Sequence, residues 1–144
     1  MKKSIAIILL VIYCSCKTTH ESGTEKNHPA AITPGTCNIK GQIITTLPPE
    51  DPDSSAICAK YACRARVKIL EVYGCGSSVT LPVNSGDTMV MKFAYTLHST
   101  EIIPNMPAHF PGLKNGDIFY AAVHQRMVMG TSGEFTVYDY ELKK

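Results

Sequence analysis

The chain has 144 residues, of which 44% are hydrophobic and 18% charged, and its formal net charge is +2. Lys2 and Lys3 account for this excess, because the residues from Cys37 onward carry ten basic and ten acidic side chains without a run of either sign. Proteins that bind nucleic acid through its phosphates carry a concentrated basic patch. The composition therefore argues against nucleic acid as a partner.

The N-terminus has the pattern of a secretory signal peptide. Lys2 and Lys3 precede an apolar run from Ile5 to Tyr13, which is the order of charged and hydrophobic regions in exported proteins. The run is shorter than the roughly 20 residues that a membrane-spanning helix needs. We therefore expect export, with residues 1–15 as the signal peptide.

Two cysteines, Cys14 and Cys16, lie at the expected cleavage site. Signal peptidases require small residues before the cut, so Ser15 favours cleavage before Cys16 and Tyr13 disfavours cleavage before Cys14. The run LLVIYCSC resembles a bacterial lipobox, although Tyr13 stands where leucine is usual. The resemblance implies acylation of Cys16, and several acyl chains at about 0.8 kcal/mol per buried CH₂ form a durable membrane anchor. It places the protein in the bacterial cell envelope, at the outer membrane if the source is Gram-negative.

Residues 16–36 are predicted to form a lipidated, flexible tether. They contain few large apolar side chains and are rich in Thr, Pro, Gly and charged residues. Such a segment cannot bury enough surface to offset the entropy that it would lose on ordering. The remaining residues, 37–144, have the length of one small domain.

Five segments of this domain alternate apolar and polar residues, as β-strands do. They are residues 38–46, 65–74, 88–97, 117–124 and 134–142. In the second segment the apolar side chains change sides between Ile69 and Leu70, which predicts a β-bulge. The longest connection follows the third segment and carries three prolines, so any helix in it must be short. Five strands with this long connection predict an all-β fold, a Greek-key OB-like barrel.

One face of the third segment is apolar and is predicted to point into the barrel core, where methionine fills irregular gaps. Its side chains are Met89, Met91, Phe93, Tyr95 and Leu97. A copper(I) site is the alternative, because thioether and imidazole ligands suit this ion. Further candidate ligands in the same half of the domain are His98, His109, His124, Met127 and Met129. Since no paired motif spacing supports copper, we expect no metal and no cofactor.

Five runs resemble, in order and spacing, the strands of the netrin-like domain found in tissue inhibitors of metalloproteinases and complement proteins. They are NIKGQIITT, ARVKILEVYG, MVMKFAYT, GLKNGDIFYAAV and EFTVYDYEL, and together they cover most of residues 37–142. The resemblance implies an alternative function, inhibition of a metalloprotease whose zinc is chelated by an N-terminal Cys-x-Cys. Cys14 and Cys16 match that motif, and His20 lies near the family's His-Pro. Chelation would require a free Cys14 amine, which the disfavoured cut after Tyr13 would have to produce.

Four cysteines remain in the domain, and an even number in an exported chain favours disulfides, with three possible pairings. Cys58 and Cys63 are placed to close a small loop, which leaves Cys37 and Cys75 to meet at strand ends. Zinc ligation and free thiols are the alternatives. Zinc lacks support from a Cys-x-x-Cys spacing.

The sequence contains no phosphate-binding glycine-rich loop and no Gly-x-Ser-x-Gly motif, so we expect a binding protein and not an enzyme. In OB domains the ligand lies on the second and third strands and the adjoining loops. The predicted ligand face therefore comprises Arg64, Arg66, Lys68 and Lys92, beside the connection from His98 to Lys114. An extracytoplasmic protein is the expected class of partner, in addition to the membrane that holds the anchor.

Overall fold

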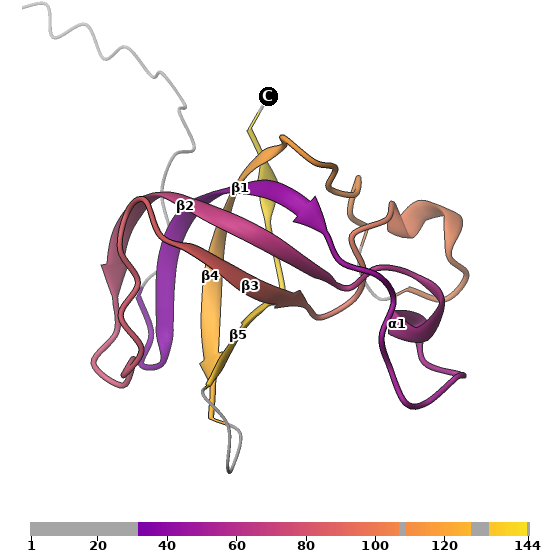
Figure 1. Cartoon of the computed structure of the whole chain (residues 1–144), viewed down its shortest axis with the longest axis horizontal. Helices are drawn as coiled ribbons and strands as arrows, with labels where there is room; N and C mark the ends of the chain where they lie inside the picture. The colour runs from indigo at the N-terminus through magenta and orange to yellow at the C-terminus, as the bar shows by residue number, and fades with distance from the viewer. Residues whose placement is uncertain (1–31, 107–108, 128–132, 144) are drawn as a thin grey trace, which may run out of the picture.

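The computed structural model describes residues 32–106, 109–127 and 133–143 (Figure 1). The predicted signal peptide and most of the tether lie outside the described residues. The same holds for Cys14, Cys16, His20 and Met129.

Five strands close into a barrel, which confirms the predicted all-β, OB-like fold. Their bounds are β1 (Thr36–Thr46), β2 (Arg64–Cys75), β3 (Thr88–Phe93), β4 (Ile118–Arg126) and β5 (Glu134–Val137). The strands pair in the order β1-β2-β3-β5-β4, and β4 pairs with β1 to complete the circuit. Only the β3–β5 pair of this circuit is parallel.

The alternating side chains of all five strands form one apolar core, as the sequence pattern predicts. The most buried members are Ile39, Ile43, Val67, Ile69, Met91, Phe93, Phe119, Val123, Phe135 and Val137. Gly41 occupies the centre of β1 because a Cβ there would lie 2.9 Å from Val67 Cγ1 and 3.0 Å from Phe119 Cζ. The two large neighbours fill the space that a side chain would need.

The predicted β-bulge in the second strand is confirmed. In the register of β1 with β2, Lys40 faces Glu71 and Gly41 faces Ile69, so Leu70 has no partner. The extra residue changes which side of β2 is apolar. Side chains before Leu70 and after it consequently reach the outer surface in two separate groups.

Two predicted strands differ from the observed ones. The third ends at Phe93, and Leu97 is buried although it lies beyond the strand, where its N–H donates to Ala62 O at 2.8 Å. The fifth is divided into β5 and β6 (Glu141–Leu142), because Val137 faces Val123 whereas Leu142 faces Phe119. The chain advances five positions from Val137 to Leu142, whereas β4 advances only four from Phe119 to Val123. The fifth segment therefore contains one residue more than the opposite stretch of β4.

The long connection between β3 and β4 is held together by Thr100, which lies within it, and is held against the barrel by Tyr140. Its only helical turn among the described residues is the short 3₁₀ helix η1 (Thr100–Ile102), in line with the prediction. Phe110 N–H donates to Thr100 Oγ1 at 2.7 Å, and the Phe110 ring stacks on Tyr140 at 4.9 Å between centroids. Gly112 N–H donates to the Tyr140 hydroxyl at 3.1 Å.

Both predicted disulfides are present. Cys37–Cys75 joins the start of β1 to the end of β2, where the two cysteines face each other in register. Cys58–Cys63 closes the loop that contains the short helix α1 (Ile57–Lys60).

Thr36, the last residue of the predicted tether, is instead the first residue of β1. None of the helices in the described ranges has the length and apolar character needed to cross a membrane.

Candidate functional site

Four basic side chains lie together on the outer surface of β2 and β3. Arg64 faces Lys92 across the two strands, and Arg66 and Lys68 follow on β2 opposite Val90 and Thr88. Their neighbours along each strand, such as Val67 and Met91, are buried in the core, so alternation directs the basic side chains outward. We call Arg64, Arg66, Lys68 and Lys92 the basic face. The structure thus brings together the residues of the predicted ligand face.

The charges of the basic face are largely uncompensated. Arg64 forms an ion pair with Glu50 from the β1–β2 connection. Arg66, Lys68 and Lys92 have no ion-pair partner within the part of the chain that the structure describes. Like charges placed opposite each other across strands destabilise a sheet. A negatively charged partner would relieve this repulsion.

Exposed apolar side chains accompany the basic residues. Val90 on β3 is 40% exposed, and Ile44 on β1 is 44% exposed. Ile44 has no partner in the β1–β2 register, and it lies between Ile43, which faces Val67, and Thr45, which faces Arg66. The basic face therefore has exposed apolar surface beside its charges.

The β3–β4 connection lies beside the Arg64 end of the basic face, as predicted. Leu97 N–H and the Thr96 hydroxyl both donate to Ala62 O, at 2.8 and 3.2 Å. His98 contacts the Tyr61 ring at 5.3 Å between ring centroids. In Figure 1, this connection and α1 lie on the same side of the barrel.

Sequence reasoning missed a second group of polar side chains next to Lys92. Thr136 on β5 faces Lys92 on one side and His124 on β4 on the other. The Thr136 side chain is 1% exposed, and its Oγ1 has no hydrogen-bond partner among the described residues. The His124 ring contacts Tyr138 edge to face, with 5.0 Å between centroids. The parallel β3–β5 pairing creates this row, and no local pattern in the sequence indicates that pairing.

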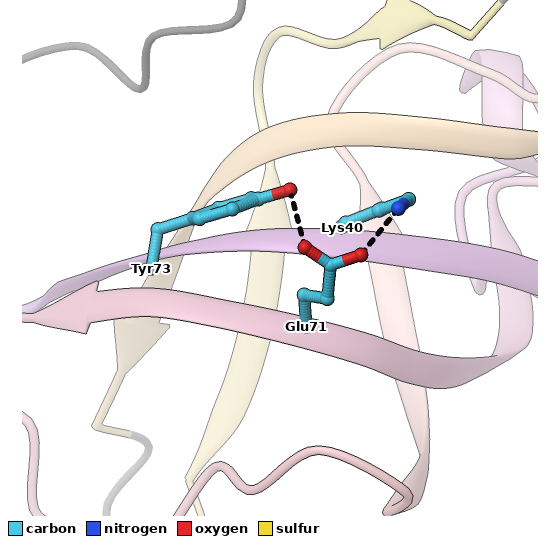
Figure 2. A network of polar contacts seen from close by, with 3 residues as sticks. All are labelled: Lys40, Glu71 and Tyr73. Atoms are coloured by element: carbon cyan, nitrogen blue, oxygen red, sulfur yellow. Dashed lines mark hydrogen bonds and ion pairs between the residues drawn. The ribbon is translucent and has the colours of Figure 1, made fainter.

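The other end of β2 carries a network in which each charge is paired (Figure 2). Glu71 Oε1 binds Lys40 Nζ, and Glu71 Oε2 accepts a hydrogen bond from the Tyr73 hydroxyl at 3.0 Å. Lys40 Nζ also lies 6.0 Å from the centroid of the Tyr120 ring. The hydrogen bond with Glu71 raises the pKa of Lys40, and the hydrogen bonds from Lys40 and Tyr73 lower the pKa of Glu71.

The described residues include no cluster of three or more His, Cys, Asp or Glu side chains that could hold a metal ion. Met91 is fully buried in the apolar core, whereas Met127 at the end of β4 is 77% exposed. A cavity lined by Phe93, Phe110 and Tyr140 has a volume of about 10 Å³, which is room for about one water molecule.

The side chains of the basic face lie on the outer surface of the barrel. Comparison with protein-family models, curated proteins and solved structures finds no match to the chain.

Proposed function

We propose that the protein is a bacterial envelope lipoprotein, anchored through acylated Cys16, whose OB-like barrel binds a negatively charged partner outside the cytoplasm. The tether between Cys16 and the first described residue, Ile32, comprises 15 residues, 17–31. A flexible chain of this length has an end-to-end distance of about 20 Å. The barrel would thus be held close to the membrane surface, where it meets envelope components.

The observation that carries this proposal is the set of basic side chains without ion-pair partners on β2 and β3. Arg66, Lys68 and Lys92 form no ion pair with the described residues, whereas Lys40 on the same barrel is paired with Glu71. The chain as a whole is nearly neutral. Attraction to an acidic partner would consequently be local to this surface and sensitive to salt.

A charge-reversal experiment tests the basic face. The double substitution Arg66→Glu and Lys68→Glu should lower the salt concentration at which the protein elutes from a column of immobilised dextran sulfate. Lys114→Glu with Lys143→Glu is the matched control, because both lysines are exposed and lie outside the basic face. The two variants have the same net charge, so only the position of the charges differs.

We expect the control to elute close to the wild-type protein and the Arg66/Lys68 variant to elute clearly earlier. Equal elution of both variants would show that net charge alone governs binding, and the basic face would then have no special role.

The anchor is tested separately through the two N-terminal cysteines. Cys16→Ser should give an uncleaved or soluble product that no longer partitions with membranes. Cys14→Ser is the control and should leave membrane partitioning unchanged. Loss of partitioning in the Cys14 variant alone would refute the assignment of Cys16.

A further inference from the structure

We propose that Lys92, Thr136 and His124 form a binding site for a phosphate or sulfate group on the outer surface of β3, β5 and β4. The inference deepens the proposed function, because it names the chemical group that the negatively charged partner would carry.

The strand register brings the three residues into one row. Thr136 faces Lys92 in the parallel β3–β5 pair and His124 in the antiparallel β4–β5 pair. Their chain neighbours Phe93, Val137 and Val123 are buried in the core, so the three side chains point to the outer surface. Paired strands are about 4.8 Å apart, which places Lys92 and His124 on either side of Thr136. Charge-assisted hydrogen bonds of about 2.8 Å from these flanking groups would hold a tetrahedral oxyanion between them.

The Thr136 hydroxyl is the distinguishing feature of the row. It belongs to a side chain that is 1% exposed, and it has no hydrogen-bond partner among the described residues. A buried hydroxyl without a partner reduces stability. Since Thr136 is 1% exposed, the groups that cover its hydroxyl would have to move aside before an oxyanion between Lys92 and His124 could supply the missing acceptor.

The other groups of the row also suit an anion. Lys92 supplies an ammonium group and His124 a ring N–H, so that both flanking residues can donate to oxygen. The edge-to-face contact with Tyr138 restricts the orientation of the His124 ring. Glu134, the acidic residue of β5, lies two positions before Thr136 and faces the cationic Arg126 in the β4–β5 register, although the described residues form no ion pair there.

The test is a titration of the full chain in detergent, followed through backbone amide NMR signals. The probes are inorganic phosphate and glycerol phosphate, at constant ionic strength with chloride as the compensating anion. Saturable shifts at Lys92, Thr136 and His124 are expected with at least one probe. Tighter binding of glycerol phosphate would assign the site to a phosphorylated molecule, and tighter binding of inorganic phosphate would assign it to the free ion. Absence of saturable shifts at the three residues with both probes would overturn the proposal.

Thr136→Val separates binding from folding, because it keeps the shape of the side chain and removes only the hydroxyl. The variant should bind the probe about tenfold more weakly or worse, since a hydrogen bond to a charged group is lost. Its thermal midpoint without ligand should stay the same or rise, because an unpaired buried hydroxyl is gone. Unchanged probe affinity, or a lower midpoint, would contradict the site.

Lys68→Met is the control on the basic face, and it should change phosphate affinity less than about twofold because Lys68 is not in this row. The control also distinguishes the two proposals. If phosphate binding fails while the Arg66/Lys68 charge reversal still shifts dextran sulfate elution, the basic face stands and the phosphate site does not.

Discussion

The two halves of β2 differ in how their polar side chains are satisfied. After Leu70, Glu71 uses both carboxylate oxygens, one for Lys40 and one for Tyr73 (Figure 2). Before Leu70, Arg66 and Lys68 have no ion-pair partner in the described part of the chain. One strand thus carries a self-contained network at one end and uncompensated charge at the other.

This difference separates polar side chains that stabilise the barrel from charges that the described residues leave unpaired. The network of Lys40, Glu71 and Tyr73 holds β1 and β2 together and requires nothing from outside. The basic face keeps like charges close together, which costs stability unless a partner neutralises them. The bulge at Leu70 divides the two groups.

The largest effect is expected from the Cys37–Cys75 disulfide at the end of β2. Replacing Cys37 and Cys75 by alanine should lower the free energy of unfolding by about 4 kcal/mol, because this bridge spans 38 positions. Replacing Cys58 and Cys63, which are 5 positions apart, should cost only about 2 kcal/mol. Urea denaturation of both variants checks the order. A larger loss for the Cys58/Cys63 variant would contradict the assignment of Cys37–Cys75 as the main constraint on the barrel.

A smaller effect is expected at Gly41 on β1, which faces Ile69 beside the bulge at Leu70. Gly41→Ala should destabilise the barrel by about 1–3 kcal/mol through overpacking, because the new Cβ would lie 2.9 Å from Val67. The outer side of the same strand provides the control: Gln42→Ala removes only the hydrogen bond from its amide to Gly116 O, at 3.2 Å, and should change stability by less than about 1 kcal/mol. Equal denaturation midpoints for the two variants would show that the barrel can relax around Gly41.

Methionine substitutions beneath the basic face should have a weaker effect still. Met89→Leu with Met91→Leu should cost less than about 1.5 kcal/mol, since the volume of the core is nearly conserved. Copper(I) titration of both proteins completes the measurement. A tight, stoichiometric copper(I) site that is present in the wild type and lost in this variant would favour the metal-binding alternative.

The smallest effect concerns the charges of the network formed by Lys40, Glu71 and Tyr73. The lowered pKa of Glu71 means that its contribution to stability is present above the ordinary value of 4.5 and is lost as the pH falls through the lowered pKa. For Lys40 the pKa is raised, so its contribution is present below 10.5 and is lost as the pH rises through the raised value.

Carboxyl NMR titration measures the first of these shifts. Lys40→Met should raise the pKa of Glu71, and Tyr73→Phe should raise it less, because the hydrogen bond from Lys40 is the larger cause. An unchanged pKa in the Lys40 variant would show that the network does not form in solution.

Much of the fold follows from local sequence pattern. Alternation located the strands and the bulge at Leu70, and the positions of Cys37 and Cys75 at strand ends indicated their pairing. Alternation also misled, because Tyr95 and Leu97 continue the apolar face of the third strand after its pairing ends at Phe93. In the fifth segment, the apolar positions change from odd numbers at Val137 to even numbers at Tyr138, in the stretch where one extra residue interrupts the ladder with β4.

The candidate site was predictable only where it depends on one strand. The outward direction of Arg64, Arg66 and Lys68 follows from the period of two along β2. The ion pair of Arg64 with Glu50 depends on how a 17-residue connection, 47–63, folds back. The row of Lys92, Thr136 and His124 depends on three strands meeting, which sequence spacing does not encode.

The most direct test of the lipoprotein assignment is the intact mass of the native protein and of its N-terminal peptide. We predict a mature chain that begins at Cys16 and carries several acyl chains, because Ser15 fits the small position before the cut and Tyr13 does not. An unmodified chain that begins at Cys14 would contradict the anchor. It would instead support the metalloprotease-inhibitor alternative, in which a free Cys14 amine is required to chelate zinc.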